Sequence, residues 1–307
     1  YAHFLLRNGK PKESLKVLQF LINRPDLLEG MQRAEAFAVA ARTFETLGML
    51  PQALRFANAA YRDHFNKEEM EDLLFRVKSK IPSFRDTYSI IVEGRKNEKN
   101  KVLERALSLY IKAIEKNRND PMPFMLIGRL YEERGEVYEA IDRYNKALFD
   151  TSEKPIDAAV NLARIYLKRF DMEKANNMIK RAEQMAISPP FRHRLDQVLY
   201  LKGIREQNLK KGDLAETFFD KALARNSRFI DLYVDLGDME VERKNEKLAE
   251  FYYATALRYS PFHPKAMLGV ALTRFHLDSP TGAVSFLKDK LSVQPNSAPI
   301  MRSEEHT

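Results

Sequence analysis

The side chains that most often perform acid–base chemistry are scattered along this sequence. Six histidines lie far apart, at His3, His64, His193, His263, His276 and His306. Closely spaced carboxylates, as a general acid–base pair needs, occur for example at Glu132–Glu133 and Asp171–Glu173, but both spacings are typical of solvated helix ends. The sequence has no cysteine, which excludes disulfides, zinc–thiolate sites and a thiolate nucleophile. Phosphate-binding Gly-rich loops and the Gly-x-Ser-x-Gly and His-Glu-x-x-His motifs are also absent, so we predict a non-catalytic protein without a metal site or a cofactor.

Basic side chains carry more information about binding. The formal net charge is +8, and residues 164–211 hold twelve Lys or Arg against five Asp or Glu. This excess predicts a basic patch that comprises Lys180, Arg181, Arg192, Arg194, Lys202 and Arg205. Solvated helix faces explain such an excess, and so does an anionic partner: an acidic protein, nucleic acid or an anionic membrane surface. Nucleic acid is disfavoured, because the basic residues do not alternate with aromatic residues and no nucleic-acid motif is present.

The composition indicates that helices carry these charges. Hydrophobic residues make up 44% and charged residues 31% of the 307 residues, with only 11 Gly and 14 Pro. No apolar run approaches the ~20 residues of a membrane-spanning helix. The chain starts at Tyr1 without an initiator Met or a signal-peptide pattern, so we expect a piece of a longer protein. The sequence assigns no compartment: cytoplasm, or bacterial periplasm if the parent carries a signal or an anchor.

An internal repeat of about 34 residues positions the charged side chains. A small residue, which we call the anchor, recurs at eight places: Ser14, Ala53, Ala106, Ala140, Ala175, Ala215, Ala249 and Ala283. The spacings between anchors are 39, 53, 34, 35, 40, 34 and 34 residues. Twelve residues before each anchor stands Ala or Gly, namely Ala2, Ala41, Gly94, Gly128, Ala163, Gly203, Gly237 and Ala271. The pattern predicts two antiparallel helices per repeat, with the small residue of the first helix facing the anchor of the second.

Turn and cap residues support these helix pairs. Gly9, Gly48, Gly135 and Gly212 predict turns between the two helices of a pair, as does the polar stretch 244–246. A helix start is predicted at Asp120–Pro121, since Asp can cap the helix and Pro suits its first position.

The repeat resembles the tetratricopeptide repeat (TPR), a helix–turn–helix unit of about 34 residues. The resemblance covers residues 1–297 and is clearest in the units around Gly128 and Gly237. The sequence departs from the family pattern in having no Trp. The resemblance implies an all-α fold, a right-handed α-solenoid superhelix of antiparallel helix pairs.

The anchor spacings predict four segments. Residues 1–65 hold two N-terminal TPR-like units, the first one truncated, and residues 87–297 hold six more. Between them, residues 66–86 hold an extra amphipathic helix with a linker, and residues 298–307 are the truncated start of a further unit or a tail. The apolar face of the extra helix consists of Met70, Leu73, Leu74, Val77 and Ile81, and Asn66 with Glu69 resembles a capping box.

Four arginines stand directly after the small residue of the first helix: Arg42, Arg95, Arg129 and Arg164, which we call the arginine ladder. The resemblance implies that this place lines a concave groove, together with Met125, Lys168 and Tyr200. Guanidinium groups suit carboxylates, so the ladder predicts a site for an acidic segment. Replacing Arg129 by Glu is then expected to weaken binding and to leave the melting temperature unchanged. In the alternative interpretation each arginine pairs with neighbouring Glu side chains.

Two functions follow from these observations. The first is a non-catalytic protein–protein interaction scaffold, a segment of a longer TPR array that organises a multiprotein assembly. The second is an adaptor that binds an acidic peptide segment in its concave groove. The expected partners are other proteins with acidic segments, and because both ends interrupt a repeat we also expect self-association through the solenoid ends.

Overall fold

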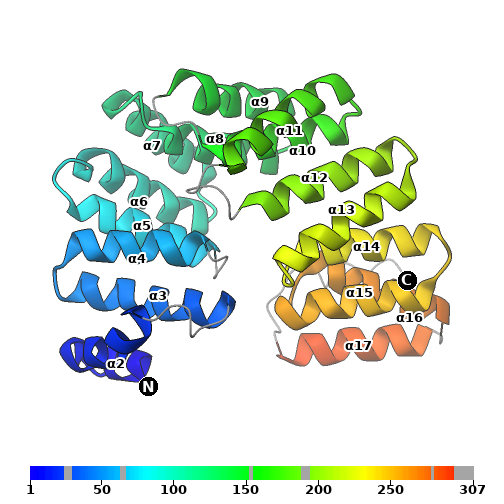
Figure 1. Ribbon diagram of the computed structural model, residues 1–307, viewed down its shortest axis with the longest axis horizontal. Coiled ribbons are helices and arrows are strands. Elements are labelled where there is room, and N and C mark those ends of the chain that lie inside the picture. The colour runs from blue at the N-terminus through cyan, green and yellow to red at the C-terminus, as the bar shows by residue number, and fades with distance from the viewer. Residues whose placement is uncertain (24–29, 63–66, 152–154, 188–193, 278–279, 294–307) are drawn as a thin grey trace. The chain divides into compact units, whose positions relative to one another are not determined.

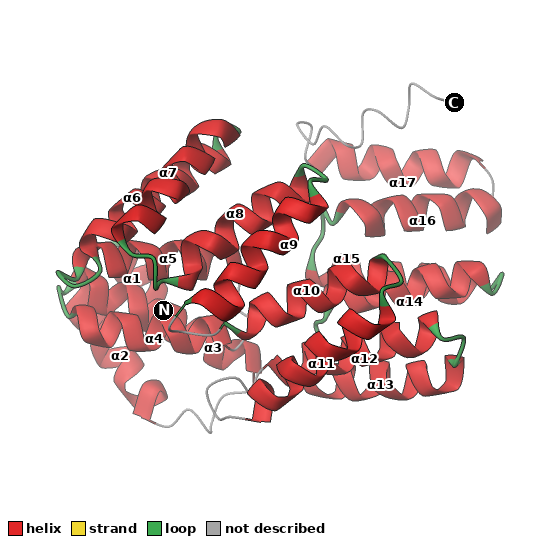
Figure 2. Cartoon of the chain, turned by 90° about the horizontal axis from the view of Figure 1, so that it is seen from above, coloured by secondary structure: helices red, strands yellow, loops and turns green. Residues whose placement is uncertain are grey.

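Helices account for all regular structure in the part of the chain that can be described. The computed structural model describes residues 1–307 apart from 24–29, 63–66, 152–154, 188–193, 278–279 and 294–307. Figure 2 shows these residues as helices joined by short loops. The predicted all-α solenoid of helix pairs is confirmed.

The chain forms two compact units, residues 1–194 and residues 195–307. The first unit contains α1 (Ala2–Arg7), α2 (Pro11–Asn23), α3 (Gly30–Thr46), α4 (Leu50–Arg62), α5 (Lys67–Lys80), α6 (Arg85–Lys99), α7 (Leu103–Lys116), α8 (Pro121–Glu133), α9 (Val137–Asn145), the π-helix η2 (Lys146–Asp150), α10 (Ile156–Lys168) and α11 (Met172–Ile187). The second contains α12 (Leu195–Asn208), α13 (Gly212–Arg225), α14 (Ile230–Glu242), α15 (Glu246–Tyr259), α16 (Pro264–Leu277) and α17 (Pro280–Val293). Within each unit, helices that follow one another in the sequence lie side by side (Figure 1). The four-segment division stays a prediction.

A left-handed residue joins the two helices of a pair. It stands seven places after the small residue of the first helix, at Gly9, Gly48, Lys101, Gly135, Phe170, Lys210 and Lys244, with φ between 57° and 76°. The turns predicted at Gly9, Gly48 and Gly135 are confirmed. Gly212 is not the turn residue, because it already begins α13 and Lys210 takes the left-handed conformation instead.

The small residue of the first helix packs against a ring, which differs from the predicted contact with the anchor. A Cβ atom added to Gly128 would lie 2.6 Å from Cε1 of Tyr144, four residues beyond the anchor Ala140. Gly94, Gly203 and Gly237 face a Tyr or Phe ring in the same way. These glycines are therefore required by the close approach of a buried aromatic ring.

The helix α5 packs between α4 and α6 in the interval where the sequence predicts an extra helix. Met70, Leu73 and Val77 are at most 1% exposed, and Phe75, which the apolar pattern omitted, is buried as well. The proposed capping residue Asn66 lies outside the described residues. Since its apolar face is fully buried, α5 is an integral layer of the first unit.

The predicted start of α8 is confirmed. The side chain of Asp120 accepts a hydrogen bond of 2.9 Å from the backbone N–H of Met122, and Pro121 occupies the first helical position. The cap fixes where α8 begins, and so fixes which of its residues face the neighbouring helices α6 and α10.

Candidate partner-binding surfaces

The arginine ladder is paired with carboxylates of the same chain. Arg42 forms an ion pair with Glu69 of α5. Arg164 donates two hydrogen bonds to Glu132 of α8, the Nη2–Oε2 bond being 2.7 Å long. The geometry is that of the alternative interpretation, in which neighbouring Glu side chains neutralise the ladder. Binding of an acidic segment by these arginines stays a prediction.

Arg95 is the most enclosed member of the ladder, with a side chain only 6% exposed. It donates hydrogen bonds of 2.9 Å to Glu98 and 3.3 Å to Asp72. Burial and the neighbouring Arg129 act to lower the pKa of Arg95, but the carboxylates of Glu98 and Glu71 outweigh them and the pKa is raised. The expectation that this arginine lines an open groove is therefore wrong, because α5 and α6 enclose it.

Two of the carboxylates also accept a hydrogen bond from a buried tyrosine. The resulting ties are Tyr110–Glu98–Arg129 and Tyr144–Glu132–Arg164. In each tie the Tyr and Glu belong to one helix pair and the Arg to the next. Burial, reinforced by the adjacent carboxylate, raises the pKa of both tyrosines well above the usual value. The arginines thus fasten successive helix pairs to each other.

The acidic partners on α5 were missed by the sequence analysis. Glu69, Glu71 and Asp72 supply carboxylates to Arg42, Arg129 and Arg95. Two of the three, Glu71 and Asp72, follow Met70 directly in the sequence. Their spacing beside an apolar helical face was the available signal, but the sequence does not say that α5 lies next to the ladder.

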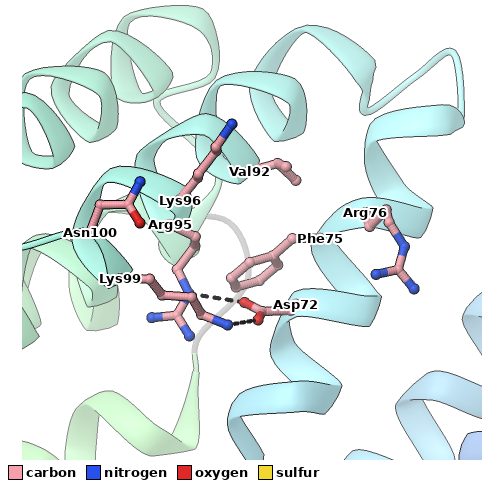
Figure 3. Close-up of a pocket in the computed structure, with 8 residues that line it drawn as sticks. All are labelled: Asp72, Phe75, Arg76, Val92, Arg95, Lys96, Lys99 and Asn100. Carbon is pink, nitrogen blue, oxygen red and sulfur yellow. Dashed lines mark hydrogen bonds and ion pairs between the residues drawn. The ribbon is translucent and has the colours of Figure 1, made fainter. Parts of the chain in front are cut away.

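A pocket of about 270 Å³ opens between α5 and α6 (Figure 3). Its polar lining is mostly basic: Arg76, Arg95, Lys96, Lys99 and Asn100, with Asp72 as the only acid. Asp72 accepts from Arg95 and forms an ion pair with Lys99, as the dashed lines of Figure 3 show. Arg76 is also bound by Glu45, so Lys96 is the one cation of the lining that forms no ion pair within the described residues.

The residues of the predicted basic patch fall in different surroundings. Lys180 is exposed, and Arg181 stacks on Phe149 at 4.6 Å from its centroid. Arg194 is 1% exposed and pairs with Asp157 at 3.0 Å, so its place in a surface patch is wrong. Lys202 and Arg205 belong to the second unit, where Lys202 lies over Phe218 and Arg205 pairs with Glu206. Arg192 lies outside the described residues.

Of the three predicted groove companions, only one is fully exposed. Met125 is half-buried on α8, and Lys168 is exposed at the end of α10. Tyr200 is half-buried on α12, packs on Phe229 at 4.9 Å between ring centroids, and donates a hydrogen bond to Asp235 of α14. Burial raises the pKa of Asp235 to about 6.

The second unit exposes a row of large apolar side chains on one face of α16. Leu268, Leu272 and Phe275 are 52%, 50% and 49% exposed, and their spacing of four and three residues places them on one side of the helix. We call them the α16 row. Val234 occupies the place of Leu268 in α14, yet it is 2% exposed. No described residue covers the α16 row in this way.

Two properties of the described residues bear on other functions. The described residues contain no group of three or more His, Asp or Glu side chains that could hold a metal ion. None of their helices is both long and apolar enough to cross a bilayer.

Comparison with known proteins identifies the fold. No protein-family model matches the chain, and neither does any curated protein sequence. Among solved structures, a tetratricopeptide repeat protein from Parabacteroides merdae has a TM-score of 0.55 at 17% identity, over 88% of this chain and 96% of that one. The Cut9–Hcn1 hetero-tetramer of the APC/C gives a TM-score of 0.56 at 13% identity, over 99% of this chain and 62% of that one. PilW, a type IV pilus biogenesis factor, gives 0.51 at 12% identity, over 71% of this chain and 97% of that one.

The geometry defines the class: an α-solenoid of antiparallel helix pairs, with a left-handed turn residue in the seven pairs whose turns are described and a close glycine–ring contact in four of them. Within that class, the chain has the tetratricopeptide repeat fold, as the resemblance implied.

Proposed function

We propose that this chain is a non-catalytic protein–protein interaction scaffold that works within a multiprotein assembly. The observation that carries the proposal is the α16 row. Its three side chains are each about half exposed on one helical face, and apolar side chains gathered in this way are typical of surfaces that another protein covers.

The buried ionisable groups support a scaffold over an enzyme. The groups of the first unit whose pKa is raised most are Tyr110, Tyr144 and Arg129, and each belongs to a tie between helix pairs. Catalytic groups need an unengaged proton donor or acceptor beside a cavity. Ties of this kind instead hold the first-helix surfaces in a fixed arrangement, which suits the docking of a folded partner.

A photo-crosslinking experiment tests the proposal. The photoreactive residue p-benzoylphenylalanine replaces Phe275 in the α16 row, and in a matched control it replaces Phe251 on α15. The two positions are equally suitable chemically, because both are aromatic, both lie in the second unit, and their exposures are 49% and 53%. After irradiation in extract of the cells that make the protein, we expect discrete heavier adducts only from position 275.

The adducts should disappear when Leu268 and Leu272 are both replaced by Asp. Adducts of equal yield from positions 275 and 251 would contradict the proposal. Adducts that contain only a second copy of this chain would show that the row serves self-association instead.

The pocket between α5 and α6 favours a second function, an adaptor for an acidic peptide segment. Lys96 lines this pocket and forms no ion pair within the described residues. A fluorescent oligoglutamate peptide should bind with micromolar affinity at low salt, as expected for exposed charge pairs of ~0.2–1 kcal/mol each, and Lys96→Glu should abolish binding. Lys112→Glu on the exposed face of α7 is the matched control. Equal loss in both variants would mean that the net charge, and not the pocket, attracts the peptide.

A further inference from the structure

A pair of aromatic rings lies exposed at one edge of the first unit, where helices turn into their partners. Tyr138 near the start of α9 is 69% exposed, and Phe170 between α10 and α11 is 70% exposed. Arg169, which directly precedes Phe170, contacts Tyr138: its guanidinium lies 4.6 Å from the ring centroid and donates a 2.7 Å hydrogen bond to the hydroxyl. We call Tyr138, Lys168, Arg169 and Phe170 the turn edge.

Phe170 is the least expected residue at its position. It has φ of 57°, in the left-handed region that bulky side chains avoid and that Gly adopts without strain. The same turn position holds Gly in three other helix pairs, at Gly9, Gly48 and Gly135. A strained phenylalanine whose ring is exposed to water contributes nothing to the core. Outliers of this kind point to a functional constraint.

Among the described residues, the arginine at the turn edge has no carboxylate partner, unlike the arginine at the same place in the preceding helix pair, α8–α9. Arg134, which stands six residues after Gly128, donates a 2.8 Å hydrogen bond to Glu104 of α7. Arg169 occupies the corresponding place six residues after Ala163, but the residue that it reaches is Tyr138, which has no negative charge. The nearby Asp171 is engaged by Lys174 at 3.0 Å.

Lys168 precedes Arg169 and is exposed as well. Neither cation has a carboxylate within ion-pair distance among the described residues, whereas every arginine of the ladder has one. Two cations without an ion pair to a described carboxylate therefore stand beside two exposed rings.

We propose that the turn edge binds a segment of a partner protein in which a carboxylate stands next to a large apolar or aromatic side chain. The rings provide rigid apolar area, which is typical of interface hot spots, and the two cations provide the complement of the carboxylate. Nucleic acid fits less well, because a phosphate backbone carries a charge at every nucleotide and would meet the exposed acids Glu139 and Glu173, whereas a single carboxylate needs only Lys168 and Arg169. The proposal depends on the scaffold function only in naming a protein as the partner, and it concerns a surface other than the α16 row.

Selection from a random peptide library on phage, with the whole chain as bait, tests the proposal. The enriched peptides should contain Asp or Glu beside Phe, Tyr, Trp or Leu. Synthetic copies are then titrated by fluorescence anisotropy against wild type, Phe170→Gly and Lys101→Gly. The two substitutions relieve the same left-handed strain at equivalent turn positions, but only the first removes an aromatic ring from the turn edge.

Phe170→Gly should weaken binding by about tenfold or more, as loss of a hot-spot side chain does. It should also raise the melting temperature by about 2–4 °C, so that lost binding cannot be ascribed to unfolding. Lys101→Gly should raise the melting temperature by a similar amount but leave the peptide affinity within twofold of wild type.

Three results would overturn the proposal. One is that Phe170→Gly binds the selected peptides as wild type does. Another is that the enriched peptides carry no acidic residue, or that Lys96→Glu at the α5–α6 pocket abolishes their binding. The third is that oligothymidylate binds more tightly than any peptide and competes at Phe170, which would assign the turn edge to nucleic acid. Each of these leaves the crosslinks from position 275 unaffected, so failure here is distinguishable from failure of the scaffold function.

Discussion

Substitution of Gly128 by Ala should destabilise the chain, although Ala is the better helix former. The added Cβ would lie 2.6, 2.8 and 3.0 Å from three carbons of the Tyr144 ring, where carbon atoms normally stay about 3.5–4.0 Å apart. The ring is 1% exposed and its hydroxyl is held by Glu132 at 3.3 Å. It therefore cannot move aside without breaking the tie between helix pairs.

The expected magnitude follows from two opposing contributions. Overpacking a core typically costs ~1–3 kcal/mol, and three overlapping ring atoms favour the upper part of that range. Helix propensity offsets ~1 kcal/mol of this cost, since Gly is less favourable than Ala by that amount in a helix interior. The net change in the free energy of unfolding should thus be a loss of about 1–2 kcal/mol.

Two further variants isolate the cause. Gly212→Ala is the matched control, because the nearest atom to its new Cβ is Nη2 of Arg243 at 3.7 Å, so this variant should gain about 0.5–1 kcal/mol. In a Tyr144→Ile background the ring is gone, and Gly128→Ala should then be neutral or stabilising. The coupling free energy of the double-mutant cycle should be about 2–3 kcal/mol.

Urea denaturation followed by far-UV circular dichroism measures the wild type and the four variants, since the sequence has no Trp for fluorescence. The reasoning is refuted if Gly128→Ala is as stable as Gly212→Ala. It is refuted equally if Gly128→Ala costs the same in the presence and in the absence of the Tyr144 ring.

Three other predictions concern the turns, the ties and the second unit. Lys210→Gly should stabilise the chain by about 1 kcal/mol and Gly135→Ala should destabilise it by a similar amount, both in urea denaturation, because each position is left-handed. Arg129→Ala should lower the free energy of unfolding by ~1–3 kcal/mol in the same assay, since it removes the charged hydrogen bonds from α8 to Glu98 and Glu71; an unchanged midpoint would contradict the tie. Burial raises the pKa of Asp235 from 3.8 to about 6, so the folded state binds its proton more tightly, and the free energy of unfolding should fall by about 1–3 kcal/mol from pH 4 to pH 6. Asp235→Asn should flatten that slope.

The packing contact inside each helix pair was present in the sequence but was not recognised. Where the first helix has Gly, the residue four places after the anchor is aromatic: Gly94–Tyr110, Gly128–Tyr144, Gly203–Phe219 and Gly237–Tyr253. Where it has Ala, that residue is aliphatic: Ala2–Leu18, Ala41–Ala57, Ala163–Ile179 and Ala271–Leu287. The eight repeats compensate volume across one contact, which is why the prediction of helix pairs succeeded although the facing residue was wrong.

The pairing of the ladder arginines with carboxylates of α5 could not be predicted from spacing alone. The repeat fixes where Arg95 stands on its helix, but α5 lies outside the repeat, and no periodicity determines the place at which an extra helix packs. Three acidic residues of α5 reach the ladder only because its apolar face is buried between α4 and α6. These contacts predict that loss of Arg129 lowers the stability, whereas the spacing alone predicted an unchanged melting temperature.

The same charges cannot both fasten the repeats and bind a partner strongly. Arg129 contacts Glu71 at 3.3 Å and Glu98 at 3.0 Å, so an acidic ligand would have to displace a carboxylate that the fold already holds in place. A tethered carboxylate has a high effective concentration, which an exposed ion pair of ~0.2–1 kcal/mol does not overcome. We therefore expect a partner to be bound by side chains that the contacts between repeats leave exposed. In the described residues such side chains include the apolar row on α16 and the cations and rings around Phe170, and the two surfaces can be tested independently because they lie in different units.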